Sequence, residues 1–415
     1  MKNLKGVALL GQSGGPTSVI NASAAGVFLE ALNQENITGV YGAVHGVKGI
    51  LNEEFYDIKK EDIEELKRLK NTPSSAIGSV RYKLKNPKQD PSDYQRILEV
   101  FKKYNIRYFF YNGGNDSMDT CNKLSKFFKK SGYECNVMGV PKTIDNDLSV
   151  TDHCPGYGSA AKYVATTFME LFHDATVYDT PMVTIVEVMG RNAGWLTAAA
   201  MLAKHKNQGP DLIYLPEVAF NTEQFRRDVK EIVKKKGKCI VAVSEGIKND
   251  EGKYIPEVFK ELSTDSFGHA QLGGTAQVLV DIVDHALPGV KTRAIEFSLI
   301  QRSAAHLASK VDVKEAFEAG RRAVKAAVSG TTDKMIGFQR ISSNPYKIKY
   351  VKIPLSKVAN TEKKVPLEWI LPNGKGLTID YINYALPLIQ GDDKAALVDG
   401  LPRFAQLNKI RVPKK

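Results

Sequence analysis

The chain has 415 residues, of which 43% are apolar and 25% are charged, so it is long enough to form two lobes that each bury a core. Its net charge of +12 comes largely from short lysine runs of the kind found on solvated helix faces and ends, so we expect no nucleic-acid partner. No apolar run approaches the ~18 residues that cross a bilayer, the N-terminus resembles no leader, and the four cysteines are scattered, so we expect a cytoplasmic protein with reduced thiols and no membrane association.

Short apolar segments alternate with amphipathic segments along the first half of the chain and beyond. We expect strands over residues 7–10, 37–44, 108–111, 136–140, 182–188, 212–215 and 239–243, and helices over residues 18–33, 61–69, 94–103, 118–130, 159–171 and 193–205. This alternation predicts an α/β protein with two Rossmann-like lobes, whose parallel-rich sheets are sandwiched by helices.

The lobes are expected to follow the chain order. We expect a first lobe over residues 1–150, completed by part of residues 265–310, and a second lobe over residues 151–264. Residues 311–415 are expected to form C-terminal helices and an extension packed on the second lobe, with a possible hairpin where residues 346–353 alternate in polarity after a Ser-Ser-Asn-Pro turn.

The segment Pro141-Lys142-Thr143-Ile144-Asp145-Asn146-Asp147 follows the expected strand 136–140. Ligand sites of open parallel sheets lie at this end of a strand. An aspartate there can accept a proton from a substrate hydroxyl, and a lysine can neutralise a phosphoryl group. A simple Asn/Asp turn is the structural alternative.

Two glycine-rich turns, residues 11–17 and 112–117, each follow an expected strand and open an expected helix. Glycines let backbone N–H groups approach an anion, and the helix N-terminus adds a favourable dipole. In the second turn, Asn115 and Asp116 can bind Mg²⁺ or orient a phosphate. Alternatively, Asn115 or Ser117 caps the helix.

Other polar groups lie near strand ends. The turns 189–194 and 244–246 offer the guanidinium of Arg191 and the carboxylate of Glu245, which can bind an anion and a sugar hydroxyl. Arg81 ends a loop of small residues, and Arg293 and Arg302 bracket a segment whose alternation is strand-like. Arginines beside glycine-rich turns indicate phosphate binding, although most surface arginines are only solvated.

Together, and in this order, the motifs GGPTSVINA, SSAIGSVR, GGNDS, PKTIDND, VEVMGRNAG, VSEG and TR…QR resemble the phosphofructokinase family, from about Gly6 to Arg302. The lysine of PKTIDND and the extension after Gly330 are similar to its pyrophosphate-dependent branch. The resemblance implies reversible, Mg²⁺-dependent transfer of a phosphoryl group from pyrophosphate to the 1-hydroxyl of fructose 6-phosphate. It also implies that the first lobe holds the donor, that the second holds the sugar phosphate, and that the chain forms a homodimer or homotetramer.

The resemblance also implies residue roles. Asp145 matches the base that takes the proton of the 1-hydroxyl and, with Asn115, a ligand of Mg²⁺. Catalytic roles also fall to Lys142, Asp116 and Arg191, with Asp116 occupying the position of a nucleotide α-phosphate. The sugar phosphate is matched by Thr143, Asp147, Met189, Gly190, Glu245, Arg293, Leu299 and Arg302, and the diphosphate by Gly14, Gly15, Arg81, Gly114 and Ser117.

Three positions depart from the family pattern. Asn115 stands where most members have a metal-binding aspartate, Leu299 replaces a polar residue, and Met182 stands where a neighbouring subunit often supplies an arginine. Two alternatives remain. One is an ATP-dependent kinase of the same fold, against which Lys142 and Asp116 argue, and the other is a non-catalytic phosphosugar-binding regulatory subunit, against which the intact pair of aspartates in PKTIDND argues.

Overall fold

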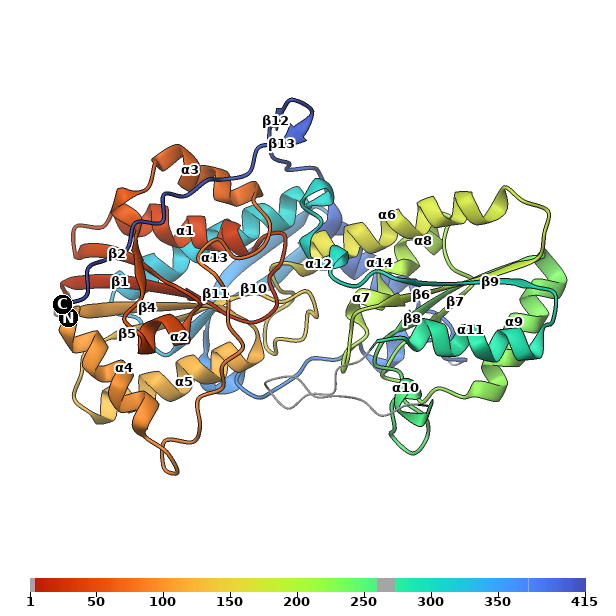
Figure 1. The fold of residues 1–415 in the computed structure, drawn as a ribbon, viewed down its shortest axis with the longest axis horizontal. Helices are drawn as coiled ribbons and strands as arrows, with labels where there is room; N and C mark the ends of the chain where they lie inside the picture. The colour runs from red at the N-terminus through yellow and green to blue at the C-terminus, as the bar shows by residue number, and fades with distance from the viewer. Residues whose placement is uncertain (1–3, 260–272, 372) are drawn as a thin grey trace.

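The computed structural model describes residues 4–259, 273–371 and 373–415. Two lobes lie end to end along the long axis of the molecule, each built around its own sheet (Figure 1). Among the described helices, none combines the length and the apolar character needed to cross a membrane.

A seven-stranded sheet forms the first lobe, in the order β11-β10-β5-β4-β1-β2-β3. Its strands are β1 (Gly6–Gln12), β2 (Ile37–Ala43), β3 (Phe55–Asp57), β4 (Ile106–Gly113), β5 (Asn136–Pro141), β10 (Lys334–Ser343) and β11 (Tyr346–Pro354). The inner strands run parallel, whereas β3 and β11 are antiparallel edges. Leu9 packs in the layer on one face, and Ala8 and Leu10 pack in the layer on the other, as the two-residue period of a strand requires.

Helices cover both faces of this sheet. One layer holds α1 (Ile20–Leu32), α3 (Ile63–Arg68) and α13 (Lys310–Val328), and the other holds α2 (Val47–Leu51), α4 (Ser92–Lys103) and α5 (Asn115–Lys130). The helices α1 and α13 cross at very short range. A Cβ on Gly26 would lie 2.1 Å from the carbonyl oxygen of Phe317, and a Cβ on Gly320 would lie 2.1 Å from that of Ser23. The two glycines therefore fix how closely these helices pack.

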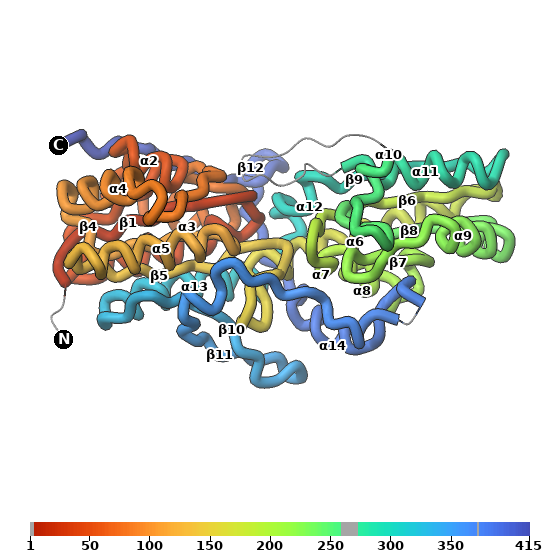
Figure 2. The backbone as a smooth tube through the Cα atoms, turned by 90° about the horizontal axis from the view of Figure 1, so that it is seen from below, coloured from red at the N-terminus to blue at the C-terminus, as the bar shows by residue number. Residues whose placement is uncertain are grey.

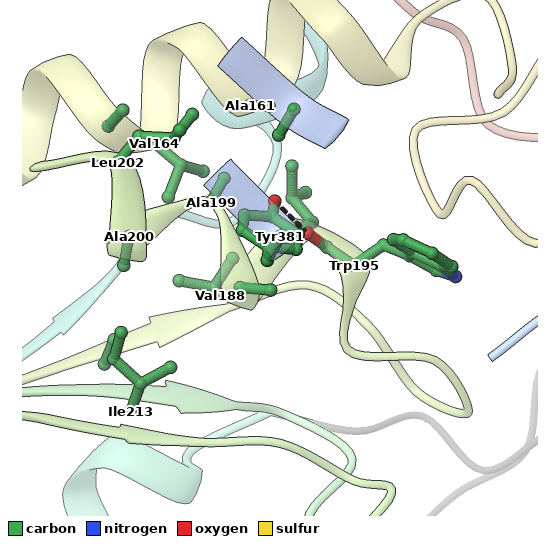
Figure 3. Close-up of a cluster of buried hydrophobic side chains, with 14 of the residues drawn as sticks. Ala161, Val164, Val188, Trp195, Ala199, Ala200, Leu202, Ile213 and Tyr381 are labelled. Carbon is green, nitrogen blue, oxygen red and sulfur yellow. Dashed lines mark hydrogen bonds between the residues drawn. The ribbon is translucent and has the colours of Figure 1, made fainter. Parts of the chain in front are cut away.

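The second lobe is built on a four-stranded parallel sheet in the order β7-β8-β6-β9. Its strands are β6 (Met182–Val188), β7 (Leu212–Tyr214), β8 (Lys238–Ser244) and β9 (Lys291–Glu296). One face packs against α6 (Tyr157–Thr176), α7 (Trp195–Ala198), α8 (Ala200–His205) and α14 (Ile379–Ala385), and the other against α9 (Thr222–Lys236), α10 (Ile255–Phe259) and α11 (Thr275–Ala286). Figure 3 shows the first of these layers, where Val188 and Ile213 of the sheet meet Val164 and Tyr381 from the helices.

Two short elements complete the chain. The helix α12 (Ile300–Ser303) lies between the lobes, and the strand pair β12 (Leu397–Val398) and β13 (Leu401–Pro402) protrudes from the surface (Figure 1). The C-terminal tail then returns along the first lobe beside β3, where the N–H of Val412 donates to the carbonyl of Phe55 at 2.9 Å.

The fold class is confirmed, but the expected lobe boundaries are not. The strand β9 pairs with β6, so residues 291–296 complete the second sheet and not the first. The expected boundary at residues 264 and 265 lies outside the described residues. Residues 311–415 pack on both lobes, because α13, β10 and β11 join the first lobe whereas α14 joins the second. Polarity patterns identify strands, but they do not encode which sheet a strand joins.

Two local expectations also changed. Arg293 and Arg302 do not bracket one strand, because β9 ends at Glu296 and Arg302 lies on α12. Ser298, in the turn between them, has a φ of +44°, which ends the extended backbone. The expected helix over residues 193–205 is two short helices, α7 and α8, whereas the expected C-terminal hairpin is present as β10 and β11.

Strand order positions the site. The strands β1 and β4 are neighbours, but the chain proceeds from β1 to β2 on one side and from β4 to β5 on the other. Such a reversal opens a crevice beyond the carboxyl ends of the two strands. Both glycine-rich turns lie at this crevice, because they directly follow β1 and β4.

We expect Gly26→Ala to destabilise the first lobe. Alanine is the better helix former by about 1 kcal/mol, but its Cβ would overlap the backbone of α13, and such overpacking costs about 1–3 kcal/mol or more. Urea denaturation should show a lower midpoint. Gly39→Ala is the matched control, because the nearest atom to its Cβ is a side-chain methyl of Val7 at 3.3 Å. Equal midpoints for the two variants would contradict the close crossing.

Candidate active site

A cleft of about 1200 Å³ lies between the lobes. The first lobe lines it with the turns after β1, β4 and β5, and the second lobe with residues that follow β6, β8 and β9. The carboxyl ends of strands from both sheets therefore open into one cavity. Two residues of the C-terminal extension, Asn360 and Glu362, complete the lining.

The turn after β1 lets two cations approach the backbone. Gly14 has a φ of +77°, and a Cβ there would lie 3.3 Å from the Nζ of Lys142. A Cβ on Gly15 would lie 3.0 Å from an Nη atom of Arg302. The Nζ of Lys142 donates to the carbonyl of Gly15 at 2.8 Å. The two glycines thus leave room for a lysine and an arginine at the same end of the cleft.

Other charges gather at this end. Arg81 and Lys83 line the cleft, and the Nζ of Lys83 lies 4.0 Å from the Oδ1 of Asp116. Asp116 stands in the first turn of α5, next to the buried Ser117. The positive charge of Arg81 and burial both lower the pKa of Arg302, with burial the larger cause. This end of the cleft is therefore suited to a multiply charged anion.

Lys142 is buried and Asp145 is half-buried in the wall of the cleft. Burial lowers the pKa of Lys142 to about 8, although the charge of Asp145 opposes this shift. Burial raises the pKa of Asp145, and the charge of Lys142 opposes that shift in turn. Thr143 orients the aspartate, because its hydroxyl donates to the carboxylate at 3.3 Å and accepts the backbone N–H of Asp145 at 3.1 Å.

Asp147 lies two residues after Asp145 in the same loop. Burial raises its pKa to about 7, and the charges of Asp145 and Glu362 add to the shift. A carboxyl group with this pKa exchanges its proton near neutral pH. The loop therefore brings two carboxyl groups of high proton affinity into the cleft.

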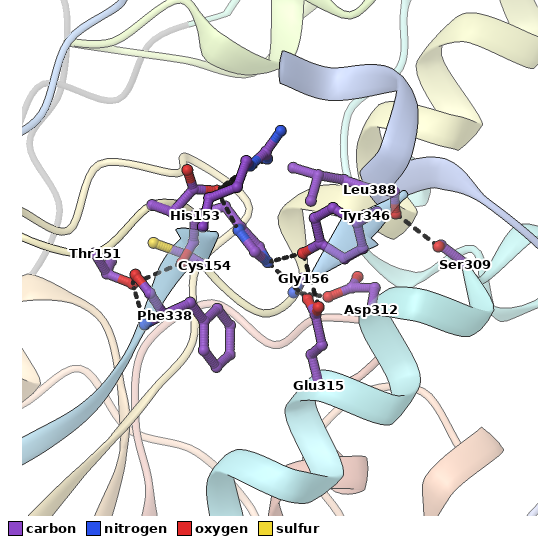
Figure 4. Close-up of polar contacts among 12 residues, drawn as sticks. Thr151, His153, Cys154, Gly156, Ser309, Asp312, Glu315, Phe338, Tyr346 and Leu388 are labelled. Carbon is purple, nitrogen blue, oxygen red and sulfur yellow. Dashed lines mark hydrogen bonds and ion pairs between the residues drawn. The ribbon is translucent and has the colours of Figure 1, made fainter. Parts of the chain in front are cut away.

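This loop is held from outside the cleft by the C-terminal extension. The buried Asn146 has a φ of +54°, and its side chain donates to the hydroxyl of Tyr384 at 2.7 Å. Further along, the ring of His153 lies between Asp152 and Glu315, with 2.7 Å to each, and Tyr346 also donates to Glu315 (Figure 4). Long-range contacts thus fix a segment that has no regular structure of its own.

The second lobe supplies a different set of polar groups. The N–H of Gly190 donates to the carboxylate of Glu245 at 3.2 Å, and the N–H of Met189 donates to the side chain of Gln301 at 3.2 Å. Burial raises the pKa of Glu245, although its bond to Gly190 opposes the shift. The Nε of Arg191 is buried and has no hydrogen-bond partner within the described part of the chain. A buried donor without a partner in the protein calls for one from outside it, such as a ligand or an ordered water.

The cleft brings together nearly all the residues predicted from the sequence. Its lining includes Gly14, Gly15, Arg81, Gly114, Asn115, Asp116, Ser117, Lys142, Thr143, Asp145, Asp147, Met189, Arg191, Glu245, Leu299 and Arg302. Gly190 is not in the lining, but its N–H binds Glu245. Arg293 lies outside the cleft, within β9, and its guanidinium pairs with Asp174 at 3.2 Å. The expectation that it joins Arg302 in one phosphate clamp does not hold within one chain.

Asn115 contacts the C-terminal extension. Its amide oxygen accepts the N–H of Asn360 at 2.7 Å, and its amide nitrogen donates to the carbonyl of Thr361 at 2.6 Å. Both polar atoms therefore bind backbone groups of the C-terminal extension. Among the residues that the structure describes, no side-chain hydrogen bond caps the N-terminus of α5.

Sequence reasoning missed several lining residues. Glu187 was detectable from the sequence, because it is the one charged residue in the apolar strand β6. In the structure, burial raises the pKa of Glu187 to about 7. Lys83 and Gln301 lie close in sequence to predicted residues. Glu362 carried no signal, because it lies in a polar segment without a motif and enters the cleft only through long-range folding.

Comparison with known proteins gives consistent matches. The sequence model of the phosphofructokinase family matches residues 7–296. The chain is 46% identical over 414 residues to the pyrophosphate–fructose 6-phosphate 1-phosphotransferase of Xanthomonas campestris pv. campestris, covering 98% of this chain and 97% of that protein. It is 43% identical to the protein of the same name from Halomonas elongata, again over 98% and 97% of the two chains. The crystal structure of a pyrophosphate-dependent phosphofructokinase from Nitrosospira multiformis matches with a TM-score of 0.90 and 41% identity, covering 99% of this chain and 98% of that one.

Proposed function

The chain belongs to the phosphofructokinase family, and we propose that it transfers a phosphoryl group reversibly from pyrophosphate to the 1-hydroxyl of fructose 6-phosphate. The products are fructose 1,6-bisphosphate and phosphate. The observation that carries the choice of donor is the buried Lys142, whose ammonium faces the glycine-rich turn beside Arg302. A compact dianionic group fits there, beside fixed cations.

On the acceptor side, Asp145 takes the proton of the sugar hydroxyl. Its raised pKa makes it a stronger base than an ordinary aspartate, and Thr143 fixes its orientation. Asp147 is placed to bind the sugar and to keep a second carboxyl group near the reacting oxygen. We assign Met189, Glu245 and Arg302 to the sugar phosphate.

On the donor side, the chain supplies position and positive charge, which carry most of the catalysis of phosphoryl transfer. We assign Lys142 and Arg81 to neutralising the pyrophosphate, and we assign its binding to the turn of Gly14 and Gly15. Arg191 offers a buried N–H without a partner among the described residues, so it can bind charge that develops on the transferring group. Gly114 and Ser117 stand at the N-terminal end of α5, which favours an anion.

The donor set fits Mg²⁺ that is bound mainly through the substrate. Among the described residues, no group of three or more His, Cys, Asp or Glu side chains is arranged to hold a metal ion. Mg²⁺ commonly binds one or two carboxylates together with substrate phosphates, and it neutralises phosphoryl charge when bound. We therefore propose Asp145 as its protein ligand, and we do not assign Asn115 to it.

We further propose a cytoplasmic homodimer or homotetramer. All four cysteines are free and buried, as in a reducing compartment. The edge strand β9 is partly exposed along its length, and its Arg293 lies outside the cleft of its own chain. In a dimer or tetramer whose neighbouring copy covers this edge, Arg293 would be able to bind the sugar phosphate in the neighbour's cleft.

The proposed function is tested by initial rates with pyrophosphate and with ATP, each with fructose 6-phosphate and Mg²⁺. We expect strong activity with pyrophosphate and weak activity with ATP, because Asp116 would repel the α-phosphate; two like charges ~4 Å apart repel by about 4 kcal/mol at an effective dielectric constant near ~20. The double variant Asp116→Gly, Lys142→Gly should lose pyrophosphate activity and gain some ATP activity. A natural preference for ATP would overturn the assignment of these two residues. Sugar-phosphate binding without turnover with either donor would favour the regulatory subunit.

We expect Asp145→Asn to lower kcat by roughly 10²–10⁴-fold in both directions, since this change keeps the shape of the side chain and removes the base. The affinity for fructose 6-phosphate, measured by calorimetry, should change little. Asp250→Asn is a suitable control, because that residue is exposed and does not line the cleft. Near-normal turnover of Asp145→Asn would show that another group takes the proton.

The lowered pKa of Lys142 predicts a pH dependence. A lysine is charged below its pKa, so at a value of about 8 the ammonium is lost as the pH rises above 8. We expect kcat/KM for pyrophosphate to fall by about tenfold per pH unit above that point. In Lys142→Arg this alkaline limb should disappear, because a guanidinium stays charged to about pH 12. Lys83→Arg, at an exposed position, should keep the limb, and a limb unchanged in Lys142→Arg would refute its assignment to this lysine.

A further inference from the structure

Residues 360–365, here called the strap, cross the molecule between the lobes. They follow the hairpin β10–β11 and a short 3-10 helix (Leu355–Lys357), and they lead towards α14 in the second lobe (Figure 2). The strap has no helix or strand of its own. It nevertheless contacts three separate turns of the cleft.

The first contact is with the turn that opens α5. Asn115 binds the strap through both atoms of its amide, to the N–H of Asn360 and the carbonyl of Thr361. The side chain of Asn360 donates in turn to Asp119 at 3.1 Å, one helical turn further along α5. The strap is therefore bound to the donor side of the cleft.

The second contact is with the loop that carries Asp145. The N–H of Lys363 donates to the carbonyl of Asp147 at 2.7 Å, and Glu362 pairs with Leu148 as an antiparallel bridge. The buried ammonium of Lys363 donates to the carbonyls of Thr151 and Asp152 at 3.1 and 2.7 Å. One strap residue thus binds this loop at both of its ends.

The third contact is with the turn that carries Arg191. The carboxylate of Glu362 accepts the side-chain amide of Asn192 at 3.0 Å. The carbonyl of Lys363 accepts the indole N–H of Trp195 at 2.8 Å. One carboxylate oxygen of Glu217 then joins the two segments, because it accepts the N–H of Gly194 at 2.8 Å and that of Val365 at 3.0 Å.

We propose that the strap sets the position of these three turns relative to one another, and that Asn115 and Glu362 are positioning residues for the transfer reaction. This inference rests on the proposed function for its kinetic part. Donor, base and acceptor groups sit on different turns and on both lobes, and transfer requires their reacting atoms within a few tenths of an ångström. A single segment bonded to all three turns meets that requirement.

Asn115→Asp tests the first contact. A carboxylate still accepts the N–H of Asn360, but it would face the carbonyl of Thr361 and repel it. The change should not unfold α5, because an acidic residue in a first turn interacts favourably with the helix dipole. We expect faster hydrogen exchange of the strap amides, and a kcat lower by about tenfold, which corresponds to ~1.4 kcal/mol, with KM for both substrates changed less than about threefold.

Asn33→Asp is the matched control, because it removes a similar donor to a backbone carbonyl at an exposed site that does not line the cleft. It should change neither the exchange of the strap nor kcat. Unchanged strap exchange in Asn115→Asp, with a tighter response to Mg²⁺, would overturn the inference and return Asn115 to the metal. Exchange is measured without substrate, so this result stands even if pyrophosphate proves not to be the donor.

Glu362 tests the third contact through a conservative pair of variants. Glu362→Gln keeps an oxygen that accepts the amide of Asn192, whereas Glu362→Ala removes it. We expect Glu362→Ala to lower kcat about tenfold with little change in KM, and Glu362→Gln to restore most of the loss. Glu368→Ala, an exposed residue of the same extension outside the cleft, should behave as the wild type. Equal rates for Glu362→Ala and the wild type, or an equal loss in both Glu362 variants, would contradict positioning through this hydrogen bond.

Discussion

The burial of Lys142 beside Asp145 is the interaction on which the cleft depends. Each charge loses hydration inside the protein, and each is the main group that offsets the other's loss. The ammonium keeps one hydrogen bond, to the carbonyl of Gly15, and so retains donors for a ligand. The turn after β1 therefore needs glycines, which leave room for the lysine. The loop after β5 must be held rigidly to keep the pair together, and the second lobe must close the other side of the cavity.

The sequence predicted the part of this arrangement that is local. Strand ends with glycine, lysine and aspartate are visible along the chain, and parallel strands bring their carboxyl ends to the same edge of a sheet. Gly14, Asp116, Lys142 and Asp145 consequently meet as expected. Whether a strand such as β9 joins one sheet or the other depends on long-range pairing, so the sequence did not show that Arg293 lies outside the cleft of its own chain.

The C-terminal extension marks the other limit of sequence reasoning. Its residues 334–390 join both lobes, and they support the loop of Asp145 through Tyr384, Tyr346 and the strap. None of these contacts has a periodic or motif signature: Tyr384 binds Asn146 across 238 positions, Tyr346 binds Glu315 from a different element, and the strap lies in irregular backbone. Asn115 shows the consequence: its motif suggested a metal ligand, but it gave no sign that the amide binds two backbone groups of the extension.

The cleft contains positively and negatively charged side chains whose arrangement affects how a charged substrate binds. The cleft lining holds the cations Arg81, Lys83, Lys142 and Arg302 near the single carboxylate of Asp116, and it also holds the carboxyl groups of Asp145, Asp147, Glu187, Glu245 and Glu362 together with Arg191. The phosphate groups of both substrates are therefore attracted to the cations and repelled by the carboxylates, which orients the substrates before any specific contact forms. Lys142 and Asp145 stand where the two fields meet. A hydroxyl placed there has a base on one side and an electrophile held by cations on the other, which is the arrangement that in-line transfer requires.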